Sequence, residues 1–123
     1  MSQPAPGQAG VLIVDDDRHI RDILRELFLS SGYQAQVAAD GREALERFDA
    51  ERPPLTVTDV HMPVMDGVEL LKKARAIDPD AAFLVLTGVA NVQTAVESLK
   101  FGAYEFFMKP VHMDELLIAA ERA

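Results

Sequence analysis

The feature that most constrains the fold is an alternation, repeated five times, between a short apolar segment and a longer segment with helical periodicity. The apolar segments cover residues 11–15, 33–39, 55–59, 81–88 and 104–108. An amphipathic segment follows each of them, such as 91–101, in which Val92, Ala95, Val96 and Leu99 share one side of a helix. Strands that alternate with helices over short connections predict a parallel sheet with helices on both faces. We therefore predict a single doubly wound α/β domain.

Several aspartates stand where the helical segments begin, and an aspartate side chain can accept a hydrogen bond from a free N–H of the first helical turn. Asp40 and Asp114 are predicted to cap the helices that follow them. The pair Asp66 and Gly67 indicates a turn that enters a helix, and Asp17 is expected to be either a cap or a solvated side chain.

Length and composition limit the organisation of the chain. A chain of 123 residues, 49% of them apolar, has the length of one globular domain. Residues 1–9 are rich in Pro, Gly, Gln and Ser, and we expect a disordered lead-in before a domain at 10–123. Because the sequence stops within its last helical segment, we expect the domain to be a piece of a longer multidomain protein.

Charge, cysteine content and hydropathy exclude some partners. The net charge of −8 argues against direct nucleic-acid binding by this domain. No apolar run approaches the length of about 18 residues that a membrane span needs, so no membrane contact is expected. The absence of cysteine is compatible with a reducing compartment, and we expect a cytoplasmic protein.

Polar residues collect at the carboxyl ends of the predicted strands, where open parallel sheets bind ligands. The first strand ends in Asp15 and Asp16, the third in Asp59, the fourth in Thr87 and the fifth in Lys109. Gathering three carboxylates is unfavourable unless a hard cation such as Mg²⁺ lies among them. Acids, a cation, a lysine and a hydroxyl together form a site for phosphoryl transfer, in which a carboxylate can be the nucleophile.

Four motifs that surround these residues resemble one protein family. The segments "VLIVDDDRHIR", "TDVHMPVMDG", "VLTG" and "GAYEFFMKP" occur in this order, and together they resemble the receiver domain of bacterial two-component response regulators. The resemblance extends over residues 10–123. It implies a flavodoxin-like, five-stranded parallel sheet with strand order 2-1-3-4-5, and a signalling switch that catalyses only its own phosphorylation and dephosphorylation.

The resemblance implies a role for each matching residue at the metal and phosphoryl positions. Asp59 matches the phosphoacceptor. Asp15 and Asp16 match the acidic pair that holds Mg²⁺, or Mn²⁺, together with Asp59 and the backbone carbonyl of His61. His61 and Val89 stand where the family tunes dephosphorylation by shaping the access of water.

Further positions match the switch elements of the family. Thr87 matches the hydroxyl that moves to the phosphoryl group, and Lys109 matches the lysine that pairs with that group. Phe106 occupies the aromatic switch position, where its packing alone would couple to Thr87. Gly88 leaves room for the phosphoryl group, and Pro110 follows Lys109 where the family often has a cis peptide bond.

The partners implied by the resemblance are a sensor histidine kinase, whose phosphohistidine is the donor, and an output domain that is either linked or separate. The face formed by 91–123 would carry the signal and could form a homodimer on phosphorylation. Two other hypotheses stay open. The chain could be an aspartate-nucleophile phosphatase, although His61 stands where such enzymes carry a second acid. It could also be a pseudo-receiver that only binds other proteins.

Overall fold

A computed structural model describes residues 10–60, 62, 64–88, 92–108 and 112–122 of the chain. Strands and helices alternate throughout this part, as predicted. Their order is β1 (Gly10–Val14), α1 (Arg18–Ser30), β2 (Gln34–Ala38), α2 (Gly41–Glu51), β3 (Leu55–Asp59), α3 (Gly67–Ile77), β4 (Ala82–Thr87), α4 (Val92–Lys100), β5 (Glu105–Met108) and α5 (Met113–Arg122).

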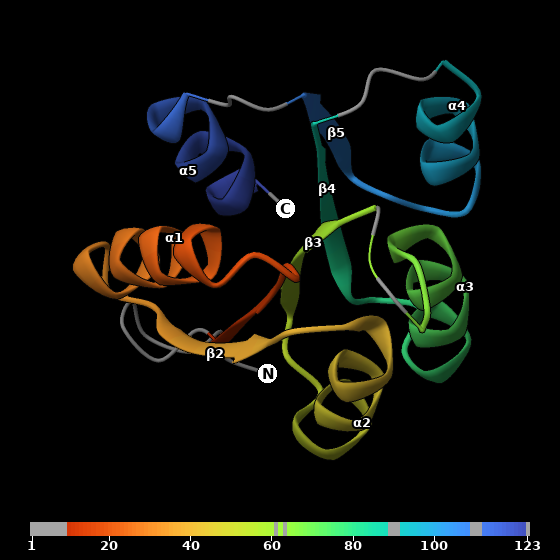
Figure 1. Cartoon of the computed structure of the whole chain (residues 1–123), viewed down its shortest axis with the longest axis horizontal. Helices are drawn as coiled ribbons and strands as arrows, with labels where there is room; N and C mark the ends of the chain where they lie inside the picture. Colours follow the sequence, from red (N-terminus) through yellow and green to blue (C-terminus); the bar gives the residue numbers. More distant parts are fainter. Residues whose placement is uncertain (1–9, 61, 63, 89–91, 109–111, 123) are drawn as a thin grey trace.

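The strands form one parallel sheet in the order β2-β1-β3-β4-β5, which confirms the predicted topology (Figure 1). All five residues of β3 are buried, as expected for the central strand of a sheet that is covered on both faces. The strands β2 and β5 form the two edges, and several of their residues are partly or fully exposed.

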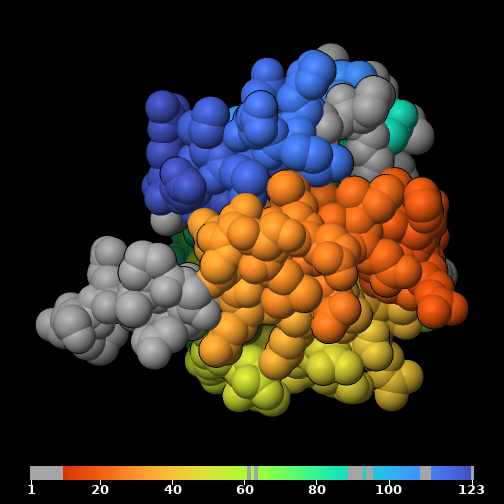
Figure 2. All heavy atoms as spheres, turned by 90° about the vertical axis from the view of Figure 1, so that its left-hand side faces the viewer, coloured from red at the N-terminus to blue at the C-terminus, as the bar shows by residue number. Residues whose placement is uncertain are grey.

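Alternate side chains of each strand enter two separate cores, because successive residues of a strand point to opposite faces. One core places Leu12 and Phe83 against α2 and α3. The other places Ile13 and Leu84 against α1 and α5. Figure 1 shows these helices on the two sides of the sheet, and Figure 2 shows α5 in blue lying beside α1 in orange.

Three helices begin with an aspartate cap, and their side-chain oxygens accept hydrogen bonds from backbone N–H groups in the first turn. The caps are Asp17 on α1, Asp40 on α2 and Asp66 on α3, with oxygen–nitrogen distances of 2.9, 2.8 and 2.8 Å. On α2 the Glu43 side chain also accepts a hydrogen bond at 2.7 Å from the amide of Ala39, the residue before the cap, which ties the entering chain to the first turn. The predicted cap at Asp40 and the predicted helix entry at Asp66 are confirmed, and Asp17 is a cap, one of the two alternatives predicted for it.

The predicted cap at Asp114 is wrong. Helix α5 begins one residue earlier, at Met113, and the carbonyl of His112 accepts the first backbone hydrogen bond, from Leu116 N at 3.1 Å. Asp114 therefore lies inside the first turn, where its negative charge still interacts favourably with the positive end of the helix dipole.

Two of the residues in the apolar stripe predicted on α4 are exposed. Val96 and Leu99 are 57% and 52% exposed, whereas Ser98 on the same helix is fully buried. The neighbouring β5 is a four-residue edge strand, so little core surface is available to cover this helix. The sequence pattern identified the stripe correctly, but it did not show whether the core covers it.

No helix in the described part of the chain combines the length and the hydropathy that crossing a bilayer requires.

Candidate functional site

Three carboxylates meet where the parallel strands β1 and β3 end. Asp15 and Asp16 follow β1, and Asp59 is the last residue of β3; one carboxylate oxygen from each lies within 4.8 Å of the others. Asp15 and Asp59 are only 1% and 8% exposed, whereas Asp16 faces solvent. The connections that leave β1 and β3 run to opposite sides of the sheet, so the acids lie at its topological switch point, where such sheets bind ligands.

Backbone contacts hold Asp15 in place at the exit of β1. Its amide donates to the carbonyl of Ala38 on the neighbouring strand at 3.2 Å. Its carboxylate Oδ1 accepts from the amide of Asp17 at 2.9 Å, and its own carbonyl accepts from Nη1 of Arg21 at 2.8 Å. Both the peptide and the side chain of Asp15 are therefore oriented before any ligand arrives.

Asp59 is held in a similar way at the end of β3. Its Oδ1 accepts from the amide of Val60 at 2.7 Å, and its carbonyl accepts from the hydroxyl of Thr58 at 2.9 Å. Helix α3 starts so close to this carbonyl that a Cβ at Gly67 would collide with it. Gly67 also donates its amide to the carbonyl of Val60 at 2.8 Å. A glycine is thus required for the loop to return so closely to the acid.

The end of β4 contributes the predicted hydroxyl. Thr87 is fully buried, and Leu86 before it is the register partner of Asp59. The next residue, Gly88, is exposed, and a Cβ built on it would meet no atom of the described residues within 4 Å. The structure therefore brings Thr87 to the same edge of the sheet as the acids.

Phe106 lies on β5 opposite Val85, two residues before Thr87 on β4. Residues two apart on a strand share a face, so Phe106 and Thr87 project to the same side of the sheet. Phe106 is partly buried and packs on the core that contains Val85. A neighbouring residue, Met108, is 53% exposed and does not fill the core.

Four residues named in the sequence analysis lie outside the described residues, namely His61, Val89, Lys109 and Pro110. Lys109 follows directly after Met108, the last residue of β5.

The site concentrates negative charge. Two unit charges separated by 4.8 Å repel by about 3 kcal/mol at an effective dielectric constant of about 20. All three carboxylates offer hard oxygen ligands, which is the donor chemistry that Mg²⁺ and Mn²⁺ prefer. The donor set therefore fits a divalent cation.

A separate cavity of about 220 Å³, lined partly by Gly10 and Gln34, lies at the opposite ends of the strands.

Sequence reasoning missed two residues that shape the site. Arg21 supplies a guanidinium to the backbone of Asp15, and Thr58 supplies a hydroxyl to the backbone of Asp59. The available signal for Arg21 was its position one turn after the cap Asp17, on a helix that starts beside the acids. Thr58 has the same residue type as its neighbour Thr56, and nothing in the sequence distinguishes them.

Comparison with known proteins gives one consistent result. Residues 11–121 match the model of the response regulator receiver domain family. The chain is 38% identical over 112 residues to sporulation initiation phosphotransferase F of Bacillus subtilis, an alignment that covers 91% of this chain and 90% of that protein. It is 37% identical over 113 residues to regulatory protein AtoC of Escherichia coli, covering 92% of this chain but only 24% of that protein. The chain thus spans about a quarter of some curated relatives.

Solved structures agree with this result. The CheX–CheY–BeF3–Mg²⁺ complex of Borrelia burgdorferi contains a chain with a TM-score of 0.87 at 28% identity, covering 92% of this chain and 87% of that one. The beryllofluoride-activated NtrC4 receiver domain dimer gives a TM-score of 0.88 at 35% identity, with coverage of 94% and 95%. Asp15, Asp16 and Asp59 form the acidic phosphorylation pocket of a signalling switch, and the chain belongs to the response regulator receiver domain family.

Proposed function

We propose that Asp59 is the phosphoacceptor and that the donor is the phosphohistidine of a sensor kinase. The observation that carries this proposal is a buried carboxylate at the end of the central strand, oriented by the amide of Val60 and placed beside Asp15 and Asp16. An oxygen of Asp59 would form the new P–O bond while the P–N bond of the donor breaks. The departing imidazole would take up a proton, which balances the transfer.

The three aspartates would also hold Mg²⁺, with Mn²⁺ as a substitute, and the backbone carbonyl of His61 would be a further ligand. When bound, the cation neutralises charge on the carboxylates and on the transferring phosphoryl group. The related Borrelia burgdorferi complex contains BeF3 and Mg²⁺, which supports this assignment. Asp15 and Asp16 would orient the cation, and Asp59 would be both ligand and nucleophile.

Thr87 and Phe106 would read out the phosphoryl group. Thr87, with Gly88 leaving room beside it, would donate its hydroxyl to a phosphoryl oxygen, and Lys109 would pair with the same group. Phe106 shares the sheet face of Thr87, so inward movement of the hydroxyl would change the space available to the ring. His61 and Val89 would set the access of water and therefore the lifetime of the phosphorylated state.

The signal would leave through the α4–β5–α5 surface, which we define by its exposed apolar side chains. Each of them is about half exposed: Val96, Leu99, Tyr104, Met108 and Ile118. Exposed apolar side chains on neighbouring elements are typical of protein interaction surfaces, and the related NtrC4 receiver domain is described as an activated dimer. We propose that this surface forms a homodimer on phosphorylation and controls a linked or separate output domain.

The cytoplasmic location of the protein stays a prediction.

The central test uses two reagents and one matched control. Wild type incubated with acetyl phosphate and Mg²⁺ should gain one phosphoryl group by intact-mass measurement, and beryllofluoride with Mg²⁺ should shift the amide resonances of Asp59 and Thr87. Asp59→Asn should abolish both results. Asp66→Asn removes an exposed carboxylate of the adjacent loop but keeps a capping side chain, and it should behave as wild type.

Several outcomes would refute the proposal. Modification that persists in Asp59→Asn would show that another residue accepts the group, and no response in the wild type would favour the pseudo-receiver hypothesis. Multiple turnover of a phosphomonoester would favour the phosphatase hypothesis. For the output surface, sedimentation equilibrium should show a dimer only with beryllofluoride, and Leu99→Glu should abolish the dimer without changing the modification of Asp59.

A further inference from the structure

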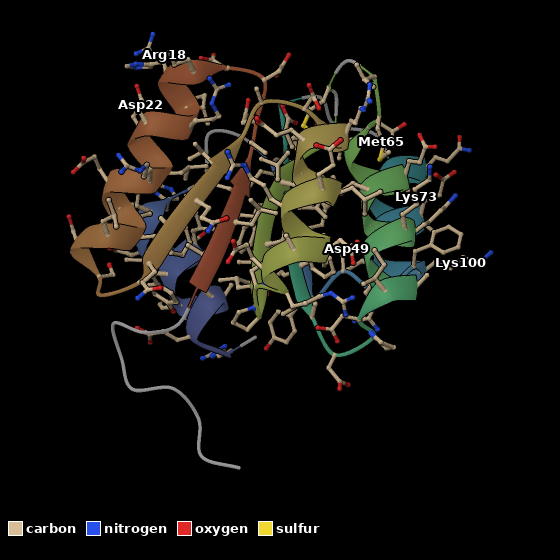
Figure 3. The ribbon with its side chains drawn as sticks, turned by 90° about the horizontal axis from the view of Figure 1, so that it is seen from below. Arg18, Asp22, Asp49, Met65, Lys73 and Lys100 are labelled. Atoms are coloured by element: carbon tan, nitrogen blue, oxygen red, sulfur yellow. The ribbon has the colours of Figure 1, made fainter. Side chains whose placement is uncertain are left out.

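Arg21 is a charged residue that lies beside the acidic pocket and that the proposed reaction does not use. It lies one turn into α1, its side chain is half-buried, and its Nη1 donates to the carbonyl of Asp15 at 2.8 Å. Arg18 starts the same helix but behaves differently. Its side chain is 86% exposed and its Nε lies 3.9 Å from the carboxylate of Asp22 on the outer side of α1 (Figure 3).

The contact acts on the residue where the chain leaves the sheet. Asp15 follows the last residue of β1, and its carboxylate Oδ1 is oriented by the amide of Asp17. The guanidinium of Arg21 holds the carbonyl of the peptide that joins Asp15 to Asp16. Rotation of this peptide would turn both neighbouring carboxylates, so fixing it fixes the direction in which two of the three acids point.

We propose that Arg21 is a positioning residue that holds the Asp15–Asp16 peptide in the orientation needed for cation binding. It touches neither the phosphoryl group nor the cation in this scheme. The inference rests on the proposed Mg²⁺ site and adds to it a residue from outside the carboxylate cluster. Removing a group that orients a metal ligand without touching the metal commonly lowers metal affinity by about 10-fold to 100-fold.

The charge of Arg21 makes the proposal testable, because its two possible effects have opposite signs. A guanidinium close to a cation site repels the cation and lowers its affinity. If charge dominated, removing Arg21 would strengthen Mg²⁺ binding. If positioning dominates, as we propose, removing Arg21 weakens binding although a repulsive charge has been removed.

The experiment measures the Kd of Mg²⁺ for the unphosphorylated domain by NMR titration of the Asp15 and Asp16 amide resonances. Arg21→Met keeps most of the side-chain length but removes both the donor and the charge, and it should raise the Kd about 10-fold or more. Arg21→Lys keeps the charge but not the planar donor fork, and it should give a Kd about 3-fold above wild type. Arg18→Met removes an equal charge from the start of the same helix and should change the Kd less than about 2-fold.

Each result decides the matter. Tighter or unchanged Mg²⁺ binding in Arg21→Met would overturn the inference. An equal loss in Arg18→Met would also overturn it, because a general disturbance of the start of α1, and not the contact with Asp15, would then explain the weaker binding. Urea unfolding of each variant identifies one that does not fold; if Arg21→Met fails to fold, a wild-type Kd in Arg21→Lys overturns the inference and a raised Kd supports it. A wild type that binds no Mg²⁺ refutes the proposed metal site and the inference with it.

Discussion

Two threonines on β3 give opposite predictions for the same substitution. Thr56 and Thr58 lie two residues apart, project to the same face of the sheet and are both fully buried. The hydroxyl of Thr58 donates to the carbonyl of Asp59 at 2.9 Å. The hydroxyl of Thr56 has no hydrogen-bond partner among the residues that the structure describes.

The magnitudes follow from this difference. A buried polar group without a partner costs about 1–3 kcal/mol, and a satisfied hydrogen bond contributes about 1 kcal/mol. Thr56→Val replaces the unpaired hydroxyl with a methyl group of similar size. The register partners of this position are Leu12 on β1 and Phe83 on β4. We expect it to raise the free energy of unfolding by about 1 kcal/mol, and Thr58→Val to lower it by about 1 kcal/mol.

The assay is urea unfolding of wild type and both variants, monitored by circular dichroism. A difference of about 2 kcal/mol between the variants separates their midpoints by about 1 M urea at an m-value of about 2 kcal/mol/M. Both variants change a buried threonine of the same strand to valine, so the contributions of strand propensity and burial to the free energy of unfolding cancel in the comparison. The reasoning is refuted if Thr56→Val is less stable than wild type, or if both midpoints move equally in one direction.

Three further predictions follow from other features of the structure. In the absence of metal, Asp59→Asn should raise the free energy of unfolding by about 1–2 kcal/mol, because it relieves part of the repulsion in the acid cluster. Urea unfolding in EDTA measures this, Mg²⁺ should reduce the difference by stabilising wild type, and a less stable variant would contradict it. Val64 has a φ of +73°, a region that a β-branched residue rarely adopts, so Val64→Gly should stabilise the fold by about 1 kcal/mol; a lower melting temperature would show that the backbone is not strained. Burial and, to a lesser extent, the nearby Glu121 raise the pKa of Tyr33 above its ordinary value of 10.0. The stability associated with Tyr33 is therefore present below pH 10 and is lost as pH rises through the folded-state pKa. In an ultraviolet titration, the pKa of Tyr33 should be raised less in Glu121→Gln than in wild type, and the same pKa in both proteins would exclude the charge effect.

Much of the fold and the site could be predicted because the relevant signals are local or periodic. The alternation of apolar and amphipathic segments predicted the strands, the helices and their parallel arrangement. Parallel strands end at one edge of a sheet, so placing Asp15, Asp59 and Thr87 at strand ends was enough to bring them together. The caps at Asp40 and Asp66 were predictable because a cap interacts with amides only two or three residues away.

The remaining features depend on which distant elements pack together, and no local pattern carries that information. Val96 and Leu99 satisfy the period of a helix, yet both side chains are exposed on a helix that lies beside a short edge strand. In the sequence Arg21 is not distinguishable from other arginines on helix surfaces. Only the folded structure shows that its guanidinium donates to the carbonyl of Asp15.

The sequence by itself therefore determined the order of the elements and the acids that would meet. Only the tertiary structure decided which polar groups are satisfied, because hydrogen bonds depend on tenths of an ångström and on atoms from several segments. It also decided which residues hold the acids in place, since Arg21 and Thr58 act through backbone carbonyls whose directions are set only when the chain has folded.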